Sequence, residues 1–180
     1  ILIHELGHAF SCRRFSLDVL HIQLHGFGGE VLRRPGTHFQ NLLVSLAGPG
    51  AGILFGLTVM IFVPMLVGGE NGVVEVVVGQ ILWVNIGWSI MNLLPIAPLD
   101  GGIALGSFLS LFSPRLAWPI TWGIGGLLGV GIGLLGFATG SLFIGAIGGY
   151  FGYNNVQAFR KFSILIHSCI QKCWGWDAYS

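Results

Sequence analysis

The chain has 180 residues, of which 53% are hydrophobic and only 8% are charged, and its formal net charge is +1. Seven acidic and eight basic side chains are too few to cover the surface of a soluble protein of this length, so the composition predicts a single membrane domain. Disorder is excluded because it requires low hydrophobicity, and the absence of a dense basic patch disfavours a nucleic-acid partner.

An HELGH sequence occupies residues 4–8, within an apolar segment at the start of the chain. On a helix, residues four apart share one face, so His4 and His8 can direct both imidazoles at one metal ion. Glu5 stands beside the first of them and can accept a proton from the water that such a metal activates. A catalytic zinc takes three protein ligands and keeps one position open. The alternative is a helix end with interfacial His and Glu side chains.

The next segment alternates between apolar and polar residues. Residues 19–25 and 30–33 flank a glycine-rich turn, which is typical of a β-hairpin, and we expect this hairpin over residues 19–33 at the cytoplasmic interface. A plain polar loop is the alternative. His21 and His25 share one face of the first strand with His38 nearby, so a second metal site is a weaker alternative to interfacial polar side chains.

Long runs without acidic or basic residues follow. A bilayer span needs about 20 apolar helical residues, so the runs predict about five crossings. They include residues 39–67, a broken crossing within 73–113, and two helices at 116–138 and 142–159 separated by a turn at 139–141. The predicted fold class is an all-α polytopic membrane bundle with a short interfacial β-hairpin.

The positions of the charges indicate a topology. All eight basic residues can be placed on one face of the membrane, and the positive-inside rule makes that face cytoplasmic. We therefore expect a multi-pass cell-membrane protein with its active site toward the cytoplasm. For all the basic residues to lie on one face, residues 73–113 must make one net crossing of the membrane. About forty residues are too many for one continuous helix, so we expect this segment to be broken or re-entrant, and Pro95 and Pro98 interrupt its helix. Unwound backbone at membrane depth is tolerated only where it is buried or lines a cavity.

A third metal ligand has few acidic candidates. Glu70 and Glu75 fall on the opposite face of this topology, and the acids of the hairpin lie at the interface. Asp100 is enclosed by apolar sequence and follows the break, where an ionisable group is costly and usually functional. The alternative is that Asp100 caps the helix beginning near Gly101.

Four sequence elements together resemble the site-2 protease family of intramembrane zinc metalloproteases over roughly residues 1–112. They are HELGH at 4–8, Gly28-Gly29 after a strand, Ala47-Gly48-Pro49, and N-x-x-P-x-x-P-L-D-G at 92–101. The resemblance implies one catalytic Zn²⁺ on His4, His8 and Asp100, with Glu5 as general base. It also implies that Asn92 binds substrate or steadies the oxyanion. A helix–helix hydrogen bond is the alternative for Asn92.

One residue departs from the family pattern. Members often carry Asn three residues after the proline of the AGP element, and Gly52 stands there in this chain. Gly52 belongs to a stripe of glycines spaced by four, and a second stripe runs through residues 125–140. Small residues let helices approach closely, so we expect packing within the chain, with a homo-oligomer face or a substrate gate as alternatives.

We expect an intramembrane metalloendopeptidase whose partners are a transmembrane protein substrate and the lipid bilayer, with no nucleic acid. The alternatives are a metal-binding membrane transporter, a catalytically silent membrane scaffold, and an ordinary zincin with a glutamate ligand. We predict one domain over 1–180, truncated at its N-terminus, with a catalytic core at 1–113, a helix pair at 114–160 and a cytoplasmic tail at 161–180. Cys169 and Cys173, one helical turn apart in that tail, are expected to be free thiols.

Overall fold

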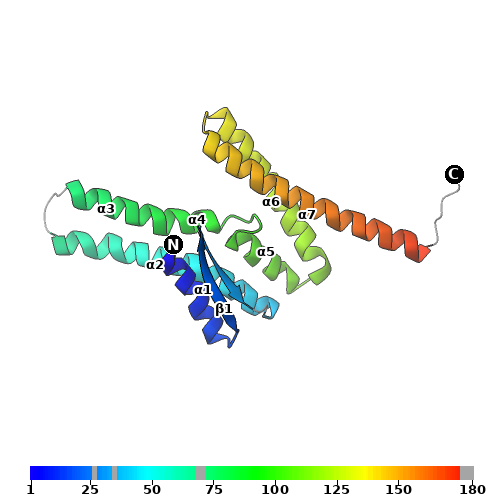
Figure 1. Ribbon diagram of the computed structural model, residues 1–180, viewed down its shortest axis with the longest axis horizontal. Coiled ribbons are helices and arrows are strands. Elements are labelled where there is room, and N and C mark those ends of the chain that lie inside the picture. Colours follow the sequence, from blue (N-terminus) through cyan, green and yellow to red (C-terminus); the bar gives the residue numbers. More distant parts are fainter. Residues whose placement is uncertain (26–27, 34–35, 68–71, 175–180) are drawn as a thin grey trace.

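The computed structural model describes residues 1–25, 28–33, 36–67 and 72–174 (Figure 1). Two strands, β1 (Val19–His25) and β2 (Gly28–Arg33), follow the first helix and pair antiparallel as a two-stranded sheet beside it. The other elements are helical: α1 (Leu2–Arg14), α2 (His38–Val67), α3 (Gly72–Leu82), the π-helix η1 (Trp83–Gly87), α4 (Trp88–Asn92), α5 (Asp100–Ser110), α6 (Pro114–Ala138) and α7 (Leu142–Trp174).

The expected count of about five membrane crossings was wrong. In the part of the chain that the structure describes, three helical segments are long and apolar enough to cross a membrane: His38–Val63, Gly72–Asn92 and Pro114–Ala138. Helix α5 has 11 residues, and a span needs about 20. Helix α7 is long, but Asn154, Asn155 and Gln157 interrupt the apolar run expected to cross at 142–159. The three apolar helices indicate a membrane protein.

The segment expected to form one broken crossing divides into a span and a short returning helix. Helices α3, η1 and α4 run on as one continuous rod, and residues 93–99 then leave helical geometry. Ile96 buries the middle of this loop in the protein, since only 1% of its surface is exposed. A Cβ on Gly101 or Gly102 would collide with the backbone of this loop, so α5 starts directly against it. The loop thereby directs the first turn of α5 back toward α2, which α5 contacts.

Two antiparallel helix hairpins make up most of the molecule, with α5 in contact with both (Figure 1). In one, α2 packs against α3, η1 and α4, while α1 lies along α2. In the other, α6 packs against α7 after a turn in which Gly140 takes a left-handed conformation with φ of 77°. Glycines of α6 face glycines of α7 along this second hairpin, as Gly129 faces Gly152 and Gly136 faces Gly145. The second glycine stripe therefore packs within the chain.

Candidate metal centre

Helix α1 presents a polar face to the protein interior. His4, Glu5 and His8 are buried, with 5%, 3% and 8% of their surface exposed, whereas Leu6 and Phe10 are 47% and 74% exposed. This arrangement is the reverse of a helix on a soluble protein, where apolar side chains face inward. It is the arrangement expected of a helix that keeps ionisable groups inside a membrane protein and apolar ones toward lipid.

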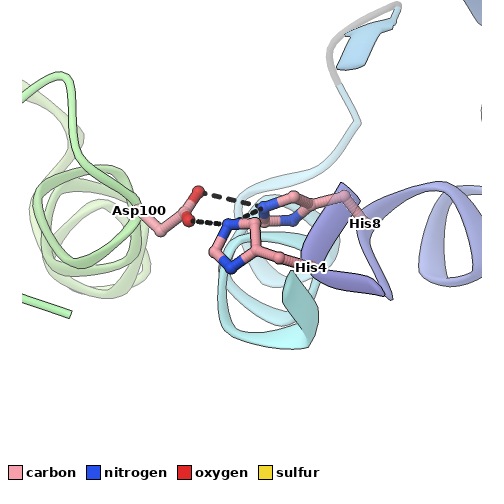
Figure 2. Close-up of side chains that lie close together, drawn as sticks. All are labelled: His4, His8 and Asp100. Atoms are coloured by element: carbon pink, nitrogen blue, oxygen red, sulfur yellow. Dashed lines mark hydrogen bonds and ion pairs between the residues drawn. The ribbon is translucent and has the colours of Figure 1, made fainter. Parts of the chain in front are cut away.

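The side chains of His4, His8 and Asp100 meet at one point (Figure 2). The Nε2 atom of His4 lies 3.0 Å from Oδ2 of Asp100, and Nε2 of His8 lies 3.3 Å from Oδ1 of the same carboxylate. The two imidazole Nε2 atoms are 3.2 Å apart. The histidines come from α1 and the aspartate from the first turn of α5, so the cluster joins residues far apart in the sequence.

Helix α2 determines how His8 is presented. The Nδ1–H of His8 donates a hydrogen bond of 2.7 Å to the carbonyl oxygen of Val44, which leaves the lone pair on Nε2 facing the cluster. One turn along α2, a Cβ on Gly48 would collide with the imidazole of His8. Gly48 therefore leaves the space in which the ring sits, and Val44 selects its tautomer. An outer hydrogen bond of this kind is typical of metal-binding histidines.

The three side chains fit a divalent metal ion. Their candidate donor atoms lie within 4.8 Å of one another. Two imidazole nitrogens and a carboxylate oxygen form a set of three protein ligands of the kinds that catalytic zinc sites use. Because the lone pair of His8 and the carboxylate of Asp100 point at the same place, a cation there would satisfy groups that otherwise repel one another.

Asp100 does not serve as a helix cap. The N-cap of α5 is Leu99, and no side-chain hydrogen bond caps this helix. The capping alternative was therefore wrong, since the carboxylate of Asp100 faces the two histidines instead. Its place in the first turn of α5 still favours a negative charge, because the positive end of the helix dipole lies there.

The two predicted catalytic residues differ in placement. Glu5 is buried beside the cluster, close enough for its carboxylate to interact electrostatically with His4, His8 and Asp100. Asn92 ends α4, and its amide donates a hydrogen bond of 3.2 Å to the carbonyl of Trp88 within the same helix. This bond differs from the helix–helix bond considered as the alternative, and the role of Asn92 in the reaction stays a prediction.

Gly52, the departure from the family pattern, lies on α2 and faces η1 and α4, the opposite arm of the same helix hairpin. A Cβ there would collide with the hydroxyl oxygen of Ser89 and lie 3.0 Å from the carbonyl oxygen of Asn85. Ser89 is 1% exposed and Asn85 is 8% exposed, so η1 and α4 place polar side chains against α2 at this level. Sequence reasoning missed both residues, although polar residues in an apolar run were a usable signal.

The other candidate ligands stand apart from the cluster or outside the described residues. Glu75 is exposed near the start of α3, and it does not belong to the described group of metal-ligand side chains. Helix α3, which carries Glu75, follows the end of α2 at Val67. Gly48, which contacts His8 of the cluster, lies roughly 28 Å from that end of α2 at a helical rise of about 1.5 Å per residue. The side chains of His21, His25, Cys169 and Cys173 and all of Glu70 lie outside the described part, so predictions on them stay open.

Comparisons with known proteins place these features in context. No family model matches the sequence. A provisionally named zinc metalloprotease from Synechocystis sp. is 31% identical over 153 residues, which cover 79% of this chain and 37% of the relative. A zinc metalloprotease from Methanocaldococcus jannaschii is 26% identical over 110 residues, covering 61% of this chain and 32% of that protein. The chain thus spans well under half the length of these curated relatives.

A solved structure shares the fold. It is described as a site-2 protease from Methanocaldococcus jannaschii, and it superposes with a TM-score of 0.68 at 21% sequence identity. The match covers 88% of this chain and 73% of that chain, so it includes most of the helices described above.

Proposed function

We propose, on the premise that this chain belongs to the site-2 protease family, that it is an intramembrane zinc metalloendopeptidase. Its reaction is the hydrolysis of peptide bonds within or near the transmembrane segments of membrane-protein substrates. The observation that carries the proposal is the convergence of His4, His8 and Asp100 next to a buried Glu5. A binding protein needs the three ligands, whereas hydrolysis also needs a base beside them.

Each residue of the site has a separable task. His4, His8 and Asp100 would hold the zinc ion, and a zinc ion bound there would supply Lewis-acid activation of water and of the scissile carbonyl. Glu5 accepts the proton of the attacking water and later delivers it to the leaving amine. The hydrogen bond from His8 to the Val44 carbonyl keeps the imidazole in one tautomer throughout.

The substrate must unwind before it can react. A transmembrane helix hides its carbonyl groups in its own hydrogen bonds, and exposing them within a bilayer is costly. The β1–β2 hairpin beside α1 offers sheet edges to which an extended substrate segment can add as a further strand. We propose that the Asn92 amide releases its hydrogen bond to the Trp88 carbonyl and donates to the substrate instead. On this proposal, Asn92→Leu changes KM or kcat without loss of zinc.

We place the site toward the cytoplasmic side of a cell membrane. The basic residues Arg13 and Arg14 end α1 within two turns of His8, and the positive-inside rule assigns such residues to the cytoplasm. Single-cysteine variants Gly36→Cys and Gly69→Cys should be labelled by an impermeant reagent from opposite sides of an intact membrane. Labelling of both from the same side contradicts this topology.

The test of the function compares the wild-type protein with Glu5→Gln. Zinc content and cleavage of a transmembrane reporter are measured on the same purified samples. Both proteins should bind zinc, and turnover should fall by about 10²- to 10⁴-fold in Glu5→Gln, because an amide cannot accept the proton. Equal turnover would refute Glu5 as the base. Zinc binding without any cleavage by the wild type would favour a metal transporter or a silent scaffold.

A further inference from the structure

A buried asparagine on the last helix reaches the loop that precedes Asp100. Asn155 lies on α7 and is 2% exposed. Its Nδ2 donates a hydrogen bond of 2.6 Å to the carbonyl oxygen of Ala97 and another of 2.8 Å to that of Phe151. The first bond joins the C-terminal helix hairpin to the loop at 93–99, which lies between the membrane span ending at Asn92 and the helix that begins with Asp100.

The orientation of this amide is determined by its neighbours. Both of its partners are carbonyl oxygens, which can only accept hydrogen bonds, so the NH₂ group must face them. The oxygen Oδ1 is buried and has no hydrogen-bond partner among the described residues. A buried amide that leaves its own acceptor unpaired is costly, which indicates that the two donated bonds decide the position of the side chain.

Helix α6 lies between α7 and the loop, and at Gly125 it has no side chain to separate them. A Cβ on Gly125 would come within 2.5 Å of Asn155 Oδ1 and 3.2 Å of the Cα of Ile96. Any larger residue at 125 would therefore occupy the space through which Asn155 reaches the loop. The contact therefore depends on both residues, because the absence of a side chain at Gly125 on α6 leaves room for the side chain of Asn155 from α7.

Hydrogen bonds carry this contact on to Asp100. The amide of Leu99 donates to the carbonyl of Ile96 at 2.8 Å, and the amide of Ile103 donates to the carbonyl of Leu99 at 3.0 Å. The residue held by Asn155 lies inside the first of these turns, and Asp100 directly follows it. A shift of the Ala97 carbonyl therefore moves the start of α5, from which the Asp100 carboxylate reaches the two histidines.

We propose that Asn155 is a positioning residue for the metal ligand Asp100, acting from the C-terminal helix pair through the Ala97 carbonyl. The inference rests on the proposed function, since it gives Asp100 a metal to bind. It extends the catalytic unit beyond the core predicted at 1–113, because a residue of α7 determines the placement of a ligand on α5.

The chain supplies a matched control on the same helix. Asn154 also donates its amide to the carbonyl four residues back, that of Tyr150, at 3.0 Å, but it makes no bond to the loop. Asn155→Leu removes both bonds at similar volume, and Asn155→Asp turns an acceptor toward two carbonyl oxygens. Asn154→Leu and Asn154→Asp make the same chemical changes one position away. Gly125→Ala breaks the contact from the opposite side, with Gly123→Ala as its control because no atom lies near a Cβ there.

The readout is the metal site itself, measured on the full chain with Co²⁺ in place of zinc. The visible absorption of bound Co²⁺ reports the number and geometry of its ligands, and titration yields its affinity. We expect both Asn155 variants and Gly125→Ala to change the absorption band and to weaken Co²⁺ binding by about 10- to 100-fold. The Asn154 and Gly123 variants should match the wild type in both measurements.

Thermal unfolding of the same samples separates positioning from packing. The Asn155 and Gly125 variants can unfold at a lower temperature than the Asn154 and Gly123 controls, and some of them can fail to fold at all. If every variant that does fold keeps the wild-type Co²⁺ band and affinity, the positioning role is overturned, and Asn155 serves only to pack α7. A wild-type chain that binds neither Co²⁺ nor Zn²⁺ overturns the proposed function as well. A wild type that binds metal, with unchanged binding in the variants, overturns the positioning role alone.

Discussion

Glycine serves two different purposes in the two halves of the molecule. In the region of α1, α2 and α5, Gly48 leaves space for the imidazole of His8, so the missing side chain admits a functional one. In the α6–α7 hairpin, Gly129 faces the backbone of Gly152, so the missing side chains admit another helix. Individual glycines with the same spacing therefore admit a side chain at one position and a helix backbone at another, depending on what faces each of them.

The largest effect should follow from removing the third ligand. Asp100→Asn keeps the shape of the side chain but replaces an anionic oxygen donor with a weak neutral one. We expect zinc affinity to fall by more than about 100-fold, beyond what changes around the ligands cost, and cleavage to be lost. Zinc titration and the reporter assay measure this, and circular dichroism should show a retained fold. Wild-type zinc affinity in Asp100→Asn would contradict the ligand set.

Next in size is the effect of filling the space beside His8. In Gly48→Ala the new Cβ collides with the imidazole, so the ring must tilt and its bond to the Val44 carbonyl weakens. We expect zinc affinity to fall by about 10- to 100-fold. The matched control is Gly50→Ala on the same helix, where nothing lies within 4 Å of the added carbon. Equal zinc affinity in the two variants would show that Gly48 has no part in the site.

A substitution in the other half should affect stability and spare the metal. In Gly133→Ala the new Cβ would lie 2.8 Å from the backbone nitrogen of Gly149, so α6 and α7 must separate. We expect a loss of about 1–3 kcal/mol in the free energy of unfolding, measured by thermal or denaturant unfolding in detergent. Gly131→Ala, with no neighbour within 4 Å, is the control. A stable Gly133→Ala protein would mean that the glycine contact is dispensable.

The smallest effect belongs to an acid far from the cluster. Glu75 is exposed near the start of α3, so Glu75→Gln should leave zinc content and cleavage within experimental error of the wild type. Loss of zinc from Glu75→Gln, together with its retention in Asp100→Asn, would support an ordinary zincin and refute the site as we describe it.

Local periodicity allowed part of the site to be predicted. The spacing of His4 and His8 needs only one helical turn, and α1 does place both on its buried face. The long helix expected at 39–67 is observed as His38–Val67, and the turn at 139–141 separates α6 from α7. The number of membrane spans could not be predicted in this way, because the absence of charge alone does not separate a short buried helix such as α5 from one that crosses a bilayer.

By itself, the sequence determined that this is an apolar, helical chain with two histidines and a glutamate on one helix, because these properties depend on composition and on neighbours within one turn. Only the tertiary structure decided what meets them. Asp100, which the sequence already indicated as the third ligand, brings its carboxylate to the histidines from α5. The Val44 carbonyl and, through Ala97, the Asn155 amide arrive from two further helices, and the sequence indicated neither. Backbone carbonyls occur at every residue, and a contact such as that of Asn155 with Ala97 spans 58 positions, so no pattern in the sequence distinguishes them before the helices pack.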